Sequence, residues 1–227
     1  FNHFIVIATV IVVGLAASFQ FLIPDEKRPV AASKKFFSKP DKSLVKLGVI
    51  AFCCMICEGA MFDWSGIYFQ KVVQANQHWV GAGYIAFMST MAAGRFFADR
   101  FVSRFGFKTT IQFSGLLITT GLLIALLFPS LVFAIAGFFI VGFGVSSIIP
   151  LVYSEAGRSK VVSPGIALAS VSSVGFLGFL VGPPLIGIVA GLSSLRVSFL
   201  IIALIGTLIV FIVGYGAKKA RTADPIS

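Results

Sequence analysis

The chain has 227 residues, of which 58% are hydrophobic and 11% carry a charge, and its mean hydropathy is +1.02. Soluble domains carry about 25% charged residues, so this composition excludes an ordinary soluble protein. The net charge of +10 would indicate nucleic acid in a soluble protein. Here the basic residues lie between hydrophobic runs, where they are typical of membrane orientation. We therefore expect an all-α integral membrane protein in the lipid bilayer, with no nucleic-acid partner.

Seven apolar runs predict seven transmembrane helices, because a helix crosses the hydrocarbon core with about 20 residues. In chain order they are 4–23, 47–69, 79–98, two spans within 109–154 that separate at Phe128-Pro129-Ser130, 161–195 and 197–217. Ser163-Pro164 is typical of a cap and first turn, and it predicts the start of the sixth helix.

The distribution of charge tests this count, because successive loops lie on alternate sides of the membrane. One side collects sixteen Lys and Arg residues and the other only Lys71 and Arg196. Basic residues favour the cytoplasm, so we expect the C-terminus to be inside. The predicted domains are a transmembrane helix (1–23), a basic cytoplasmic linker (24–46), a six-helix transmembrane bundle (47–217) and a cytoplasmic tail (218–227).

A cluster of charge interrupts the apolar sequence at GRFFADRFVSRFGFK, residues 94–108. We expect a short basic turn between the third and fourth spans, with Asp99 as a buried acid at its start. The pattern Gly-Arg-x-x-small-Asp-Arg-x-x-x-Arg-x-Gly resembles the cytoplasmic loop signature of the major facilitator superfamily of transporters, although Ala98 stands where Gly is more usual. The residues that match this gate motif are Gly94, Arg95, Asp99, Arg100, Arg104, Gly106 and Lys108.

The resemblance implies twelve helices in two six-helix bundles joined by a cytoplasmic linker. This chain then corresponds to the last helix of the first bundle, the linker and the whole second bundle, and the missing N-terminal bundle is its partner. The resemblance implies secondary active transport of a small solute by alternating access in the bacterial inner membrane, and the position of Glu58 leads us to expect coupling to protons. A fragment with one bundle and one helix would not transport alone. It also implies that Asp99 pairs with Arg95 or Arg100 and with the start of the sixth helix.

A second motif lies in the sixth span and is similar to the glycine-proline motif of the family's eleventh helix. Its residues are Gly178, Gly182, Pro183, Pro184 and Gly187. Each proline removes a backbone donor and clashes with the preceding turn. We therefore expect a break in the sixth helix at Gly182-Pro183-Pro184.

Glu58 is the strongest candidate for chemistry. It lies within the second span, where an ionised carboxylate costs about 2.5–3.5 kcal/mol. We expect no cation of this chain at its depth, so that desolvation favours a protonated carboxyl. A proton site in the transport cycle and a neutral Glu bonded to a neighbouring helix are both open. The predicted substrate and proton pathway comprises Glu58, Asp63, Ser146, Ser147 and Gln112.

Asp63 follows Glu58 by five residues, about 140° round the helix, so the two acids do not share a face. A cap or an interface anchor is the favoured role for Asp63. Cys53, Cys54 and Cys57 lie in an apolar run, and we expect inert, membrane-facing thiols rather than a metal or redox site. No cofactor or metal is expected.

Two other classes of protein remain as alternatives. A membrane enzyme is disfavoured, because the chain contains no H-E-x-x-H and no nucleophile-elbow sequence. A non-transporting sensor or scaffold derived from the same bundle remains an alternative, although an acid such as Glu58 within a span disfavours it.

Overall fold

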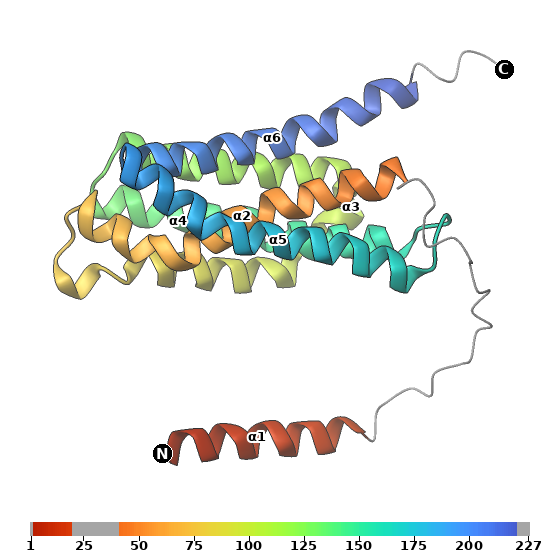
Figure 1. Cartoon of the computed structure of the whole chain (residues 1–227), viewed down its shortest axis with the longest axis horizontal. Helices are drawn as coiled ribbons and strands as arrows, with labels where there is room; N and C mark the ends of the chain where they lie inside the picture. The colour runs from red at the N-terminus through yellow and green to blue at the C-terminus, as the bar shows by residue number, and fades with distance from the viewer. Residues whose placement is uncertain (1, 20–40, 222–227) are drawn as a thin grey trace. The chain divides into compact units, whose positions relative to one another are not determined.

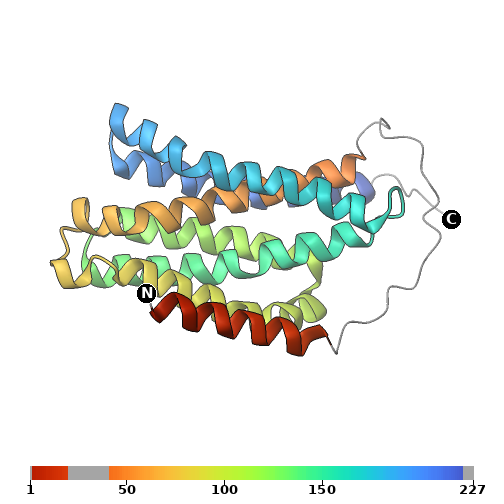
Figure 2. The ribbon, with the colours of Figure 1, turned by 60° about the horizontal axis from the view of Figure 1, so that its bottom comes forward.

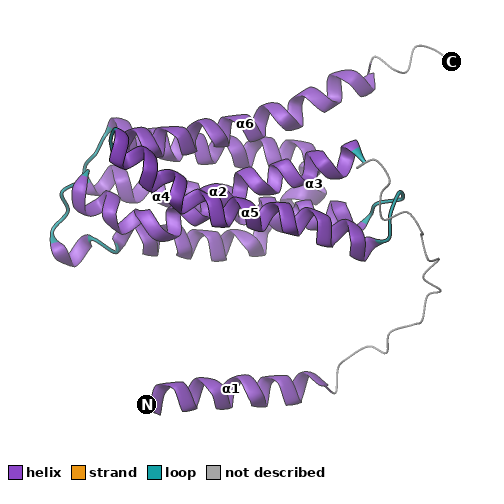
Figure 3. Ribbon diagram, in the orientation of Figure 1, coloured by secondary structure: helices purple, strands orange, loops and turns teal. Residues whose placement is uncertain are grey.

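The structure is a computed structural model that describes residues 2–19 and 41–221. Within these ranges the chain is helical between short connections and has no strand (Figure 3). It divides into two compact units, Phe1–Ser38 and Lys39–Ser227.

The first unit contains α1 (Asn2–Phe19), which corresponds to the predicted span 4–23. Its described apolar part, Ile5–Ala17, is shorter than a membrane crossing requires. Most of the predicted linker lies outside the described residues. Lys42 and Lys46, which we placed in the linker, belong instead to the first turns of α2.

The second unit is a bundle of long helices: α2 (Lys42–Lys71), α3 (Ala82–Leu127), α4 (Leu131–Gly157), α5 (Pro164–Leu192) and α6 (Leu195–Arg221). A 3-10 helix, η1 (Gln77–Trp79), lies between α2 and α3. The connections 72–81, 128–130 and 193–194 lie at one end of the bundle, and the 158–163 connection and the start of α2 lie at the other (Figures 1 and 2).

Local signals set three helix ends. The Asp41 side chain accepts a hydrogen bond from the Ser43 N–H at 3.3 Å and caps α2, which begins five residues earlier than predicted. The break at Pro129 is confirmed, since α3 ends at Leu127 and α4 follows Ser130. Ser163 and Pro164 begin α5 as predicted.

The predicted charged turn is mostly helical. A straight helix of 46 residues would extend about 69 Å, yet the rings of Phe101 and Phe113 stack with centroids 6.3 Å apart. The chain therefore folds back between them, at Gly106, whose φ of 78° is favourable only for glycine. The helix continues from Gly94 to Phe105, and the turn is confined to the region of Gly106. We call residues 82–105 the first arm of α3 and residues 107–127 the second arm.

The predicted break in α5 is wrong, because the helix runs unbroken through Pro183 and Pro184. The backbone of α2 packs closely against this region. A Cβ atom at Gly182 would lie 2.9 Å from the Ile56 carbonyl oxygen, and one at Gly59 would lie 2.9 Å from the Phe179 carbonyl oxygen. Phe179 is the carbonyl that loses its helical partner at Pro183, so the neighbouring helix covers the freed group.

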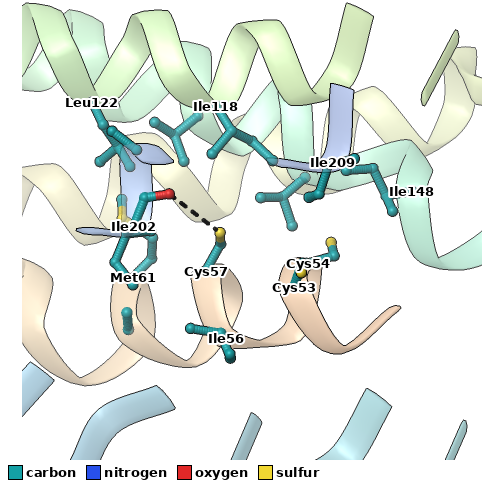
Figure 4. Packing of buried hydrophobic residues seen from close by; sticks show 14 of the residues in the cluster. Cys53, Cys54, Ile56, Cys57, Met61, Ile118, Leu122, Ile148, Ile202 and Ile209 are labelled. Atoms are coloured by element: carbon teal, nitrogen blue, oxygen red, sulfur yellow. Dashed lines mark hydrogen bonds between the residues drawn. The ribbon is translucent and has the colours of Figure 1, made fainter. Parts of the chain in front are cut away.

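The three cysteines lie inside the bundle, so their predicted exposure to the membrane is wrong. Cys54 and Cys57 are fully buried, and Cys53 is 4% exposed. They pack among isoleucines of α3, α4 and α6, and the Cys57 Sγ lies 4.0 Å from the Ile202 carbonyl oxygen (Figure 4). Among the apolar helices described, α2 is the most buried, and its apolar run therefore faces neighbouring helices.

In the part of the chain that the structure describes, five helical segments are long and apolar enough to cross a membrane, and one of them contains the folded α3. The count of seven spans stays a prediction. The described basic residues at the two ends of the bundle follow the predicted asymmetry. Lys71 and Arg196 lie at one end, and Lys42, Lys46, Arg100, Arg104, Lys108, Arg158 and Lys160 lie at or near the other.

Candidate functional site

Glu58 and Asp63 lie on α2 and have different surroundings, as the helical period predicts. Glu58 is partly buried, while Asp63 is exposed. Four residues after Glu58, the ring of Phe62 contacts α3 and α5, with its centroid 6.2 Å from Phe87 and 5.9 Å from Phe179. Glu58 is one turn from Phe62 and therefore on nearly the same face of α2.

Arg95 is an exposed residue of the first arm of α3, but it lies near the depth of Glu58, contrary to the expectation that no cation shares this depth. The Phe62 ring also contacts Tyr84, with centroids 5.9 Å apart, which sets the register of the antiparallel α2 and first arm of α3. Arg95 follows Tyr84 by eleven residues, which is about 20° from the same direction on the helix. Counting 1.5 Å per residue from the Phe62 contacts, Arg95 and Glu58 differ by about 8 Å along the axes. Among the described residues, Arg95 is the cation that interacts electrostatically with Glu58.

The depth of Arg95 follows from the same register. It lies opposite residues of α2 that are about 16 Å from the basic end at Lys42, and about 16 Å before the bend at Gly106. A cation at that depth of an apolar bundle is a candidate for function rather than orientation. The spacing of Tyr84 and Arg95 in the sequence indicates this depth. Arg95 was nevertheless predicted to lie in a turn, because other charged residues follow it closely.

Ser146 and Ser147 are buried on α4, 3% and 7% exposed. The Ser146 hydroxyl donates to the Phe143 carbonyl oxygen at 2.6 Å, and the Ser147 hydroxyl lies 3.0 Å from that of Ser114 on the second arm of α3. Gly94 lies directly against Ser146, and a Cβ atom at Gly94 would collide with that side chain. The first residue of the gate motif and a predicted pathway residue are thus in contact.

A small open hollow lies where the two arms of α3 meet α4. Its lining residues are Gly94, Phe97, Ala98, Phe101, Thr110, Phe113, Ser114, Leu117, Phe143, Ser146 and Ser147. The lining consists of three serines, one threonine, four phenylalanines, and a glycine, an alanine and a leucine. Ser114 is a member that sequence reasoning missed, because a single hydroxyl in an apolar helix carries no distinguishing pattern.

Gln112 belongs to a different part of the bundle. Its side-chain amide donates to the Val210 carbonyl oxygen of α6 at 3.5 Å, and its Nε2 lies 3.2 Å from the position of a Cβ at Gly214. The structure therefore places Gln112 in the packing of α3 against α6, apart from Ser146 and Ser147.

The charged residues of the gate motif lie on the surface. Arg95, Asp99, Arg100, Arg104 and Lys108 are exposed, so the expected burial of Asp99 is wrong. Within the described residues no ion pair or hydrogen bond links the Asp99 side chain to Arg95, Arg100 or the start of α5, and the expected pairing is not made in this structure. Arg104 instead lies over the ring of Phe105, 5.5 Å from its centroid.

The glycine-proline motif holds α5 against α2. Gly178 contacts the backbone of Phe52, and Gly182 contacts that of Ile56. A Cβ atom at Gly187 would lie 3.1 Å from the Trp64 ring. The Trp64 Nε1 donates to the Pro183 carbonyl oxygen at 3.1 Å. The motif is therefore an interface between parallel helices in this structure.

Tyr153 on α4 is a further polar residue near Glu58. Its hydroxyl is buried and has no hydrogen-bond partner in the described part of the chain. It interacts electrostatically with Glu58 and lies 3.8 Å from the position of a Cβ at Gly175 on α5. No group of three or more His, Cys, Asp and Glu side chains that could hold a metal occurs among the described residues.

The sequence profile of the Major Facilitator Superfamily matches residues 3–160, more than half of the chain. The chain belongs to this superfamily, and it is an integral, multi-pass membrane protein. It is 31% identical over 211 residues to the membrane protein MosC of Rhizobium meliloti, a match that covers 92% of this chain and 52% of MosC.

Two further relatives are named as transporters. An uncharacterised MFS-type transporter of Yersinia pestis is 35% identical over 159 residues, covering 70% of this chain and 41% of that protein. An uncharacterised transporter of Sinorhizobium fredii is 33% identical over 170 residues, covering 75% of this chain and 45% of that protein. The chain spans about half the length of the curated relatives it matches.

Proposed function

We propose that the protein containing this chain is a secondary transporter that moves a small solute across the membrane by alternating access, coupled to protons at Glu58. The observation that carries the proposal is a partly buried acid on α2, the most buried apolar helix, in a member of a transporter superfamily. The relatives named as transporters support the transport of a solute. Coupling to protons rests on the position of Glu58.

Glu58 can carry a proton because its surroundings change when a transport cavity opens and closes. An acid that binds a proton in apolar surroundings and releases it when hydrated exchanges one proton per cycle. Binding and release on opposite sides of the membrane would couple the solute to the proton gradient. The exposed Asp63 on the same helix lacks these surroundings.

We also propose that the whole transporter contains an N-terminal bundle and lies in the bacterial inner membrane. A bundle that pairs with an N-terminal bundle would form the solute cavity between the two. The bacterial relatives support an inner-membrane location, and the basic end of the bundle favours the cytoplasmic side. Solute transport without chemical conversion is expected, so the protein is not an enzyme.

Glu58→Gln tests this function in the full-length protein. Gln keeps the shape and hydrogen-bonding capacity of Glu but cannot ionise. In membrane vesicles, Glu58→Gln should abolish proton-driven accumulation of a solute and spare counterflow, which exchanges solute without net proton movement. Asp63→Asn is the matched control on α2 and should accumulate the solute like the parent.

Two outcomes would contradict the proposal. Accumulation by Glu58→Gln equal to the parent across a range of pH would make Glu58 a structural residue. Failure of the folded parent to move any solute of a broad metabolite panel would favour the sensor or scaffold alternative.

A further inference from the structure

A continuous series of contacts connects the hollow beside α4 with the bend of α3. The rings of Phe101 and Phe113, which both line the hollow, stack with centroids 6.3 Å apart. The Phe101 ring also lies 5.5 Å from the ring of Phe105, centroid to centroid. The Arg104 guanidinium carbon in turn lies 5.5 Å from the centroid of Phe105. We call the hollow together with Phe105 and Arg104 the arm groove.

The arm groove is apolar and open at the surface of the bundle. Phe97 and Phe113, which line the hollow, are 49% and 45% exposed, and Phe105 is 49% exposed. Exposed apolar side chains that gather around a hollow mark a binding surface for apolar groups. In an integral membrane protein, the hydrocarbon chains of lipids are the apolar groups that surround such a surface.

The hydroxyls of the hollow are already bonded within the protein. Thr110 and Ser146 donate to backbone carbonyl oxygens of their own helices at 2.9 and 2.6 Å. The hydroxyls of Ser114 and Ser147 bond to each other at 3.0 Å. A hydrocarbon chain can therefore cover all four residues without leaving a buried hydroxyl unpaired. The hollow suits such a chain better than a polar solute.

Positive charge collects where the arm groove reaches the bend. Arg100, Arg104 and Lys108 are exposed there, and Asp99 is the one acidic residue of α3. Asp99 precedes Arg104 by five residues, about 140° round the helix, so the two do not share a face. In the part of the chain that the structure describes, no carboxylate pairs with Arg104. Its guanidinium is therefore available to an anionic group.

The order of these features along the helix axes is the order found in a phospholipid. Arg104 is two residues from the bend at Gly106, about 3 Å along the axis. The hollow extends to Gly94 and Leu117, which are about 17 Å from the bend by the same rise per residue. The cation thus lies at the basic end of the bundle, and the apolar hollow lies deeper, where acyl chains follow a phosphate.

We propose that the arm groove binds an anionic phospholipid, with its phosphate at Arg104 and one acyl chain along the phenylalanine rings into the hollow. The paired donors of a guanidinium match the oxygens of a phosphate. The positive charge of Arg100, Arg104 and Lys108 favours an anionic headgroup, such as that of phosphatidylglycerol, over a zwitterionic one. The site does not depend on the transport function proposed above.

Quenching of a tryptophan placed in the hollow tests the inference. Phe113→Trp keeps an aromatic ring at this position, and the full-length protein without the substitution measures the signal of the native tryptophans. The protein is placed in phosphatidylcholine vesicles that contain a rising fraction of brominated phosphatidylglycerol or brominated phosphatidylcholine. Because both carry bromine at the same chain positions, a difference in quenching reports the headgroup. We expect phosphatidylglycerol to bind about fivefold more tightly, the preference that one arginine at a membrane surface confers.

Substitutions of charged residues separate a site from diffuse surface charge. In the Phe113→Trp protein, Arg104→Gln should make the two lipids quench equally, and Arg104→Lys should retain part of the preference. Arg158→Gln, which removes an exposed cation outside the arm groove at the same end of the bundle, should retain all of it. Leu204→Trp, at a position of α6 that is 60% exposed, reports ordinary lipid and should be quenched equally by both.

Three results would overturn the inference. Equal quenching of Phe113→Trp by the two lipids would show that the hollow has no headgroup preference. Equal losses in Arg104→Gln and Arg158→Gln would assign the preference to diffuse charge. Absence of quenching by either lipid would show that another part of the full-length protein covers the arm groove.

A measurement of stability tests the same site without a new tryptophan. Phosphatidylglycerol added to the purified full-length protein in detergent should raise its unfolding midpoint, because a ligand that binds only the folded state stabilises it. Arg104→Gln should unfold at the midpoint of the parent without this lipid, since Arg104 is exposed, and should gain little when the lipid is added. If phosphatidylglycerol stabilises Arg104→Gln as much as the parent, Arg104 does not bind the phosphate and the inference is wrong.

Discussion

The indole Nε1 of Trp64 donates a hydrogen bond of 3.1 Å to the carbonyl oxygen of Pro183, and this bond ties α2 to α5 where α5 contains two consecutive prolines. Pro183 and Pro184 cannot donate to the carbonyls of the preceding turn. The contact of Gly59 with the Phe179 carbonyl and the Trp64 bond lie on either side of this gap. A helix with two internal prolines thus stays continuous because its neighbour fits against it.

Trp64→Phe should destabilise the bundle by about 1 kcal/mol, because it removes the donor while keeping an aromatic ring in place. The change is measured as the midpoint of unfolding of the purified full-length protein in detergent. Trp79→Phe is the matched control, since Trp79 is 52% exposed and no hydrogen bond of its indole is described. Equal midpoints for the two variants would show that the Trp64 bond contributes nothing.

Gly178→Ala should destabilise the protein by about 1–3 kcal/mol, the usual cost of an added methyl group in a packed interface. The added Cβ would collide with the carbonyl of Phe52, which is helix backbone and cannot move aside. Gly191→Ala, on the same helix, has no atom within 4 Å of the new Cβ and should not lower the unfolding midpoint. If Gly178→Ala is tolerated equally well, α2 and α5 are less closely packed than described.

Gly106→Ala should destabilise the bend of α3 by about 1 kcal/mol, because a residue with a Cβ pays a steric cost at a φ of 78°. Space is not the cause, since no atom lies within 4 Å of a Cβ built there. Gly165→Ala, in the first turn of α5, also meets open space but lies in a helix, where Ala is favoured. The two substitutions should therefore shift the unfolding midpoint in opposite directions.

Features fixed by local chemistry could be predicted from the sequence, and features fixed by packing could not. Pro129 and Pro164 mark helix ends because each restricts its own backbone. Pro183 carries the same local signal, but the close fit of Gly59 and Trp64 overrides it, and neither residue is near it in sequence.

The candidate site shows the same division. Glu58 was identifiable because an acid in an apolar span is rare. Arg95 was hidden because it precedes four other charges in the sequence and was grouped with them in a turn. The helix continues past Arg95 to Phe105, and Arg95 lies about 20° round this helix from Tyr84, which contacts Phe62 of α2.

The orientation of the bundle can be tested with single cysteines at its two ends. Basic residues collect at the end that contains the bend of α3 and the 158–163 connection, which favours a cytoplasmic location for that end. In sealed cells, a membrane-impermeant thiol reagent should label Cys placed at Gln74, Ser130 or Ser194, and it should not label Cys placed at Ser103 or Ser159. The native cysteines add little background, because Cys53, Cys54 and Cys57 are buried in the bundle, and the parent protein measures what remains. Disrupted cells are the matched control, because there Ser103→Cys and Ser159→Cys should become reactive. Labelling of either variant in intact cells would reverse the orientation and place the basic end outside.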